Sequence, residues 1–226
     1  MYICTQMNHI KTFINPMKRL LFAISLLAFV VGCGGNSNKE NNSNKENNSN
    51  QANNESEDTK PKETSGPYKV GDLYLEGDVL GVVFETKSGG MHGKIVSVDE
   101  EKMQWCDNSV KDVRTDATNE YDGAENTAIL MNRYDADKYY AAYWCADYGY
   151  GWYMPAKKEL EKIYQNKSKI DRTLFKYGYS QLSDWYWSST EFVGSEFCAW
   201  SVFMNNGDTY NGRKDYNVYV RAVSAF

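Results

Sequence analysis

Histidine is scarce in this chain of 226 residues, which contains only His9 and His92. A metal site built from several histidines is therefore excluded. A histidine-dependent catalytic triad would have only His92 to use, because His9 lies in a segment that we expect to be removed. His92 follows a pair of glycines in a turn-like stretch, residues 89–93, so we expect a structural role for it.

Several other signals are absent as well. The chain has no glycine-rich phosphate loop, no dinucleotide-binding fingerprint and no zinc-ligand spacing, so we expect no cofactor and no metal. Its net charge of -5 and pI near 5.2 argue against a nucleic-acid partner. No long hydrophobic run is present: about 12 apolar residues at ~1.5 Å each reach only ~18 Å, whereas a bilayer core measures ~30 Å. A transmembrane helix is therefore not expected.

The N-terminal region does contain the pattern of a lipoprotein signal. A basic pair, Lys18 and Arg19, precedes a short apolar segment that ends in Val30-Val31-Gly32-Cys33. This run resembles the bacterial lipobox, in which the cysteine is lipidated and becomes the new N-terminus. We therefore predict that residues 1–32 are a signal peptide and that Cys33 carries lipid. Because residues 1–16 are mixed and polar, we expect translation to start at Met17, unless the basic region is merely long.

The residues after Cys33 have a very different composition. The hexapeptide Asn-Ser-Asn-Lys-Glu-Asn occurs twice, at residues 36–41 and 42–47, and a variant follows at residues 48–53. No large apolar side chain occurs in these repeats, so burial cannot offset the entropy cost of ordering them. We predict that residues 33–66 are the lipidated cysteine and a disordered asparagine-rich tether, and that residues 67–226 form one domain. Gly34 follows the lipid site and no aspartate is nearby, so by Gram-negative sorting rules we expect a surface-exposed protein anchored in the outer membrane.

Within residues 67–226 the pattern predicts strands, then helices, then strands. Residues 79–84 and 94–98 read as a hairpin, and residues 102–105 as a further strand. Helices are predicted at residues 126–131, 137–146 and 156–164. Strands at residues 186–190, 199–204, 208–211 and 218–223 follow, with a tight Asn-Gly turn at residues 205–208. This order is typical of an α+β domain that ends in an antiparallel β meander.

Four segments in this order resemble a known family. They are residues 151–160 (GWYMPAKKEL), residues 186–191 (YWSSTE), residues 199–207 with Trp200 and Gly207, and residues 220–223 (VRAV). The set is similar to the Lcl C-terminal domain family and to its relative, the Fibrobacter succinogenes major paralogous domain. The resemblance covers about residues 68–226. The resemblance implies a C-type-lectin-like domain with two to three helices. It also implies a surface-exposed module, since some members of the family bind glycosaminoglycans or other surface polymers.

The motif residues themselves read mainly as core. We expect at least one of the Tyr186 and Trp187 rings to be buried, Trp200 to share a buried face with Val202 and Met204, and Arg221 to be a partly buried ion-pair partner. The calcium- and sugar-binding triplets of calcium-dependent lectins are absent. An acidic group remains for which a solvated loop is the preferred interpretation and a calcium site the alternative: Asp112, Asp116, Glu120 and Asp122.

Three cysteines remain after lipidation: Cys106, Cys145 and Cys198. An exported protein can form disulfides, and three pairings are open, each of which leaves one thiol over. A Cys145–Cys198 disulfide would close a loop of about 53 residues and contribute roughly 3–4 kcal/mol. No histidine is placed beside a cysteine, so we expect no cysteine catalysis and no enzymatic activity.

The leading prediction is a cell-envelope lipoprotein with a non-enzymatic binding domain for a glycan or another extracellular polymer. We expect the protein to be attached to the membrane through its N-terminal lipid. The alternative is a structural or assembly component that contacts another envelope protein. Exposed tyrosine can stack on a sugar ring while asparagine and aspartate bind its hydroxyls, although plain turn chemistry explains the same residues. The candidate ligand-binding residues are Asn205, Asn206, Asp208, Tyr210, Asn211, Arg213, Lys214 and Asp215, and residues 192–196 are a second candidate surface.

Overall fold

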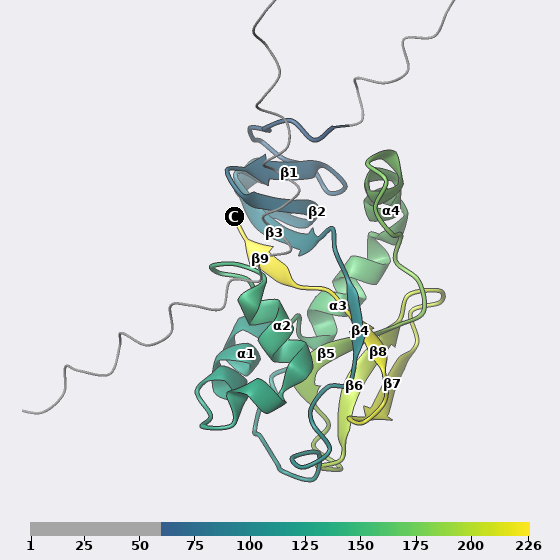
Figure 1. The fold of residues 1–226 in the computed structure, drawn as a ribbon. Helices are drawn as coiled ribbons and strands as arrows, with labels where there is room; N and C mark the ends of the chain where they lie inside the picture. The colour runs from purple at the N-terminus through teal and green to yellow at the C-terminus, as the bar shows by residue number, and fades with distance from the viewer. Residues whose placement is uncertain (1–59) are drawn as a thin grey trace, which may run out of the picture. The chain divides into compact units, whose positions relative to one another are not determined.

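The structure is a computed structural model that describes residues 60–226 (Figure 1). The predicted signal peptide, Cys33 and the asparagine-rich repeats lie outside these residues. The described part contains α-helices and two β-sheets, so the predicted α+β class is confirmed. The helices are α1 (Gly123–Met131), α2 (Tyr140–Asp147), α3 (Lys157–Gln165) and α4 (Lys167–Lys176). The strands are β1 (Leu73–Glu76), β2 (Val79–Lys87), β3 (His92–Ser97), β4 (Glu101–Met103), β5 (Trp185–Glu191), β6 (Cys198–Phe203), β7 (Thr209–Arg213), β8 (Val218–Val220) and β9 (Val223–Ala225).

The first sheet has the strand order β1-β2-β3-β9 and the second has the order β4-β8-β5-β6-β7. The predicted hairpin of β2 and β3 is confirmed, and His92 is exposed at the start of β3. Strands β5, β6 and β7 pair in sequence and antiparallel, as a meander requires. Strand β8 departs from the meander, because it inserts between β4 and β5 and runs parallel to β5.

One predicted strand, residues 218–223, is in fact two strands in different sheets. The chain breaks at Arg221, whose side chain is 1% exposed. Its guanidinium donates hydrogen bonds to the carbonyls of Ser97, Val98 and Ser180 and pairs with Glu100. A buried guanidinium requires such partners. At the residue that makes these hydrogen bonds, the chain passes from the second sheet to the first. The expected ion-pair role of Arg221 is confirmed.

Helix α4 was not expected from the sequence. Its segment is rich in lysine and its apolar positions are few, so periodicity gives only a weak signal there. Two of these positions, Ile170 and Leu174, are fully buried one turn apart. The break between α3 and α4 falls at Asn166, whose side-chain amide donates to the carbonyl of Phe84 in β2. Packing against the first sheet therefore stabilises a helix that its local sequence specifies poorly.

The domain has two hydrophobic clusters, and every residue of both lies within residues 68–226. Trp187 belongs to one and Tyr186 to the other, so both rings are buried because alternate residues of β5 face opposite sides of the sheet. The prediction for Trp200 is wrong: Val202 and Met204 are buried, but Trp200 is only half-buried. Its ring lies 3.6 Å from the ammonium of Lys157, a cation–π contact that keeps the indole near the surface.

Ordered contacts begin slightly before residue 67. The amide of Thr64 donates to the carbonyl of Leu75, and the amide of Leu75 donates to the hydroxyl of Thr64. These bonds occupy backbone groups on β1, which is an edge strand of the first sheet. No helix within residues 60–226 is long and apolar enough to cross a bilayer.

Candidate functional site

The predicted turn between β6 and β7 is present at residues 205–208. The side-chain amide of Asn206 donates to Asp208 at 2.7 Å, and the backbone amide of Asp208 donates back to Asn206 at 3.0 Å. Gly207 has φ of +83°, and a Cβ atom there would lie 2.3 Å from a ring carbon of Tyr164 in α3. Glycine is therefore required on both conformational and steric grounds. Asn206 and Asp208 serve the turn itself, which leaves Asn205 as its exposed and unengaged amide in the described structure.

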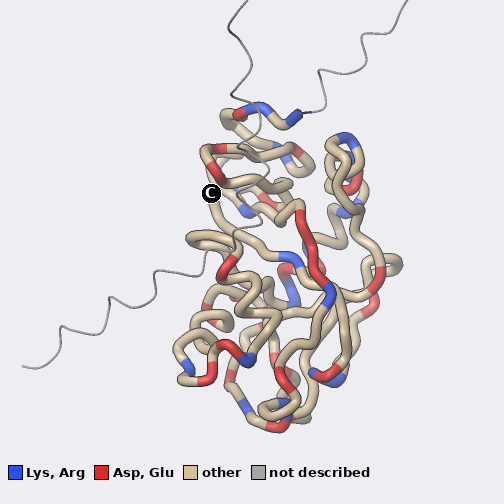
Figure 2. Tube along the Cα trace, in the orientation of Figure 1, with Lys and Arg blue, Asp and Glu red and all other residues tan. Residues whose placement is uncertain are grey.

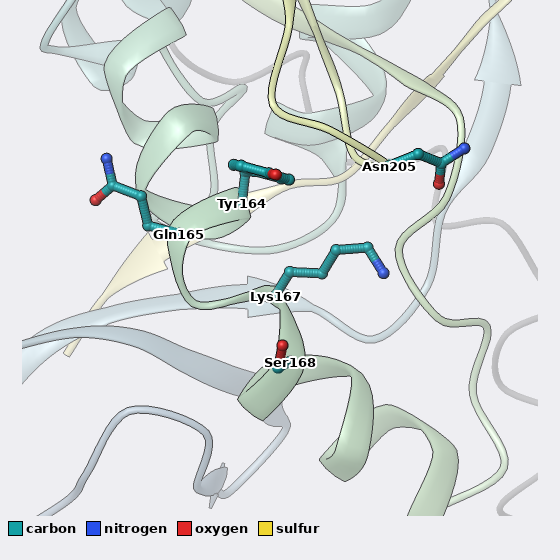
Figure 3. A pocket seen from close by; sticks show the side chains of 5 residues that line it. All are labelled: Tyr164, Gln165, Lys167, Ser168 and Asn205. Carbon is teal, nitrogen blue, oxygen red and sulfur yellow. The ribbon is translucent and has the colours of Figure 1, made fainter.

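A surface pocket of about 450 Å³ lies on one side of this turn. Asn205 lines it together with the end of α3 and the start of α4 (Figure 3). The Lys167 ammonium extends toward the side of the pocket where Asn205 lies, and this lysine also pairs with Asp171 on the next turn of α4. Amides, hydroxyls and one ammonium are groups that bind hydroxyl-rich or anionic ligands. The full lining is Tyr164, Gln165, Lys167, Ser168 and Asn205.

Three aromatic rings continue from the same turn along the second sheet. The rings of Trp185 and Phe203 stack at 4.9 Å with an interplanar angle of 25°, and Trp185 lies 6.0 Å from Tyr210. Trp185 and Phe203 are directly paired across β5 and β6, and Tyr210 follows on β7. Tyr210 is 54% exposed and the other two rings are half-buried. We call Trp185, Phe203 and Tyr210 the aromatic platform.

Polar groups lie next to the aromatic platform. Asp184 precedes Trp185, has φ of 65° and forms an ion pair of 3.6 Å with Lys102, both side chains being about half exposed. The Lys102 ammonium also lies 4.8 Å from the centre of the Tyr219 ring. An exposed pair of this kind stabilises little, so both groups remain free to exchange their partner for a ligand. The platform thus joins apolar ring faces to hydrogen-bonding groups.

The rest of the predicted ligand-binding set is not gathered at the turn. Asn211 is half-buried and paired with Trp200, at the middle of β7. Arg213 and Asp215 form a two-pronged ion pair at the other end of β7, with contacts of 3.1 and 2.7 Å. Arg213, together with Lys111, holds the pKa of the Asp215 carboxyl well below its usual range. These groups neutralise each other and form a separate surface feature.

Lys214 is not a surface residue, and its prediction as a ligand-binding group is wrong. Its side chain is 0% exposed and its ammonium lies 2.5 Å from the equally buried carboxylate of Glu191. The ammonium also donates to the carbonyl of Val113 and lies 4.8 Å from the centre of the Trp105 ring. Polar composition suggested an exposed loop, whereas an acid 23 positions away in the sequence holds this lysine in the core.

None of the three possible disulfides, Cys145–Cys198 included, is formed in the described structure. Cys106, Cys145 and Cys198 are all free thiols in the described structure. Burial raises the pKa of the Cys106 thiol to about 12 and raises that of Cys145 as well. Cys198 is half-buried at the start of β6, whereas Cys145 is a fully buried residue of α2. An exported compartment permits disulfides, but it does not tell which cysteines are buried and which lie near the surface.

Thiol titration of the domain should therefore distinguish the three cysteines. We expect Cys198 to react first with a thiol-specific reagent under native conditions, because it alone of the three is not fully buried. Cys106 and Cys145 should react only after denaturation. A Cys198 that became reactive only after treatment with a reductant would contradict the free-thiol structure and restore the disulfide.

Two other candidate surfaces are held by internal contacts. Residues 192–196 are bridged by Arg114, which reaches the carbonyl of Val193 at 3.2 Å and the carboxylate of Glu196 at 3.3 Å. The acidic residues considered as a calcium site lie along the loop before α1 and at its N-cap, Asp122, whose side chain caps the helix. Within residues 60–226, no group of three or more histidine, cysteine or acidic side chains is placed to hold a metal ion.

Comparison with known proteins adds the family. The model of the Lcl C-terminal domain matches residues 94–224, which include most of β3, every element from β4 to β8 and most of β9. No curated protein matches the chain. Among solved structures, a fimbrial protein from Bacteroides ovatus matches with a TM-score of 0.46 and 20% identity, over 59% of this chain and 36% of that protein. Because the family model covers more than half of the sequence, this chain belongs to the Lcl C-terminal domain family.

Proposed function

We propose that this protein is a lipid-anchored component of the cell envelope whose domain binds a glycan or another extracellular polymer without chemical turnover. The single observation that carries the binding proposal is the aromatic platform beside the polar turn of β6 and β7. Family membership and the lipobox-like run that ends at Cys33 support an envelope location. On this proposal the protein is anchored in the outer membrane and exposed at the surface.

The platform suits a sugar polymer for physical reasons. A pyranose ring has an apolar face of C–H groups and an equatorial rim of hydroxyls, so it needs a flat apolar partner with polar groups beside it. Trp185 on β5 and Tyr210 on β7 supply aromatic rings on either side of β6, and Asp184 and Lys102 supply an acceptor and a donor. Aromatic side chains lose little conformational entropy on binding, which makes them efficient contact residues. A row of three rings can contact successive units of a chain.

Alanine substitutions in the platform test this proposal. In a glycan array and in titrations with the best ligand, Tyr210→Ala and Trp185→Ala are each expected to weaken binding about tenfold or more, as for other exposed aromatic anchors. Tyr134→Ala is the matched control, because Tyr134 is an exposed tyrosine at the end of α1 that is 97% accessible. Thermal melts of all three variants establish that they are folded.

The result that contradicts the proposal is a folded domain that binds no glycan or matrix polymer. Equal losses for Tyr134→Ala and Tyr210→Ala would also count against it, because they would show that the platform is not special.

We propose that the domain is not an enzyme. The two buried thiols have raised pKa values and are therefore poor nucleophiles at neutral pH. His92 is exposed at the start of β3 and pairs there with Lys87 of β2. Neither group supplies the nucleophile and base that cysteine or triad catalysis would need.

An assembly role is the second candidate, and one observation favours it. Four exposed tyrosines surround α2 and its two flanking loops, and tyrosine is enriched at protein–protein interfaces. Cross-linking on intact cells followed by affinity purification separates the two functions, since a stoichiometric protein partner favours assembly. The four tyrosines are Tyr134, Tyr140, Tyr143 and Tyr150.

A further inference from the structure

Helix α4 carries a row of cations on its outward face. Lys169, Arg172 and Lys176 are spaced three and four residues apart, which places them on one side of the helix. All three are exposed, and none forms an ion pair with any residue in the range 60–226. The helix has a single acid, Asp171, which is buried on the inner side and pairs with Lys167. The outward face of α4 is therefore a basic stripe without ion pairs in the described structure, on a protein of net negative charge, although Asp72 lines the same shallow pocket as Lys176.

An apolar ring lies within this stripe. Phe175 is 73% exposed, next to Lys176 in sequence and three residues from Arg172. The buried residues Ile170 and Leu174 already supply the apolar contacts that hold α4 on the domain. Phe175 thus adds nothing to the core. An amphipathic helix that presents cations together with an exposed aromatic ring has the features of a segment that lies at a membrane surface.

The stripe lies beside the point where the described chain begins. Thr173 donates a hydrogen bond to the carbonyl of Gly71, and Lys176 lines a shallow pocket together with Thr64 and Ser65. Figure 1 shows the C-terminal part of α4 and strand β1 at one end of the domain, with β5, β6 and β7 toward the other. Figure 2 shows Lys and Arg along α4 and in the segment that leads into β1. Residues 64 and 65, near the start of the described chain, therefore lie beside the basic stripe.

We propose that the outward face of α4 docks on the anionic lipid headgroups of the membrane that holds the lipid of Cys33. This inference rests on the proposed lipid anchor for its occupant. Residues 34–59 connect Cys33 to the described domain, and even a fully extended chain of that length spans only about 90 Å. The tether therefore keeps α4 at high local concentration near the headgroups. Lys169, Arg172 and Lys176 bind the lipid phosphates, and Phe175 enters the interface.

The aromatic platform and the basic stripe lie on different elements. The platform is on β5, β6 and β7 and adjoins the β6–β7 turn, which lies at the start of α4. Arg172, Phe175 and Lys176 lie toward the C-terminal part of α4. The polymer ligand and the membrane would then contact different elements of one domain.

Vesicle sedimentation of the described domain, residues 60–226, tests the inference, and the residues of both hydrophobic clusters of the described structure belong to this segment. We expect binding to vesicles that contain phosphatidylglycerol and little binding to pure phosphatidylcholine. Each cation near an anionic surface contributes about a fivefold gain in partitioning, so K169Q/R172Q/K176Q should lower it about 100-fold. Phe175→Ala should lower it several-fold with no change in charge.

The matched control is the triple variant K111Q/R114Q/K138Q, which removes the same charge from surface side chains before and after α1. It is expected to retain binding to anionic vesicles. Equal losses for the two triple variants would overturn the inference, because binding would then follow net charge alone. Circular dichroism of each variant confirms folding.

Two further results separate this inference from the proposed function. A domain that bound a sulfated polysaccharide through the same three cations, and did not bind anionic vesicles, would overturn membrane docking. Mass spectrometry of the full chain made in a Gram-negative host shows independently whether Cys33 carries lipid. An unlipidated Cys33 combined with vesicle binding would support the basic stripe and contradict the proposed anchor.

Discussion

Replacing Lys214 with methionine is expected to lower the free energy of unfolding by about 3–5 kcal/mol. Lys214 and Glu191 are both 0% exposed, so the substitution leaves a carboxylate without its counter-charge in the core. Glu191 keeps only neutral donors, namely the amides of Thr115 and Asp116 and the hydroxyl of Thr115. Methionine is close to lysine in length, so the effect reports the lost charge rather than a cavity. Denaturant titration of residues 60–226 measures it.

Two further variants make the test specific. Arg213→Met changes the neighbouring residue, whose ion pair with Asp215 is exposed, and should cost less than about 1 kcal/mol. Adding Glu191→Gln to Lys214→Met removes the unpaired charge and keeps an oxygen acceptor, so it should recover part of the loss. Similar costs for Lys214→Met and Arg213→Met would show that the buried pair is not important for stability.

Glu159→Ala is expected to cost about 3 kcal/mol or more, because one carboxylate satisfies four donors. One oxygen accepts from the hydroxyl of Tyr153 at 2.8 Å and from the ammonium of Lys94 at 2.5 Å. The other accepts from the amides of Ala156 at 2.8 Å and Gly123 at 3.1 Å. The carboxylate thereby joins α3, the start of α1 and strand β3. Thermal and denaturant unfolding measure the loss.

Glu161→Ala is the matched control two residues further along the same helix. Glu161 is half-buried and pairs only with Lys158, three residues away, so its removal should cost less than about 1 kcal/mol. Glu159→Gln should fall between the two alanine variants, because it keeps one acceptor and loses the charge. If Glu159→Ala were as stable as Glu161→Ala, the buried carboxylate would have no organising role.

These two acids lie in the segments on which the family resemblance rests. Glu159 lies in the GWYMPAKKEL segment and Glu191 ends the YWSSTE segment. Each is a buried carboxylate held by a lysine and by a backbone amide that is distant in sequence. The expectation that the motif residues are mainly structural is confirmed for Tyr186 and Trp187, and it extends to these acids. In this chain the two segments therefore join loops and helices to the sheets.

The sequence pattern correctly predicted those elements that are determined by residues close together in the chain. Short β-branched runs on either side of a glycine-rich turn predicted β2 and β3, and Asp122 marks the start of α1 by capping it. The Asn-Gly turn was also predicted correctly. In contrast, β1 depends on its pairing with β2, α4 depends on packing against the first sheet, and β8 and β9 are separated by the non-local partners of Arg221. A local sequence pattern contains no information about contacts with residues that are distant in the chain.

The candidate site also contains some residues that the sequence identified and others that depend on contacts distant in sequence. Tyr210 and Asn205 were identified from composition, and both are exposed where a ligand can reach them. Trp185 and Phe203 were missed, because they become a surface feature only through the cross-strand register of β5, β6 and β7. Lys214 was misplaced because its partner is remote in sequence. A lysine next to an exposed arginine gives no local sign that it is buried.

The two strands on either side of Arg221 have a mechanical consequence. Strand β8 is hydrogen-bonded into the second sheet and β9 into the first. A force that separates the two sheets therefore puts tension on the short covalent segment between these strands. The side chain of Arg221 clamps that segment to three carbonyls at the same point. If the domain is anchored at one end and binds a polymer as proposed above, a force that separates the two sheets would have to stretch this covalently continuous segment as well as break hydrogen bonds.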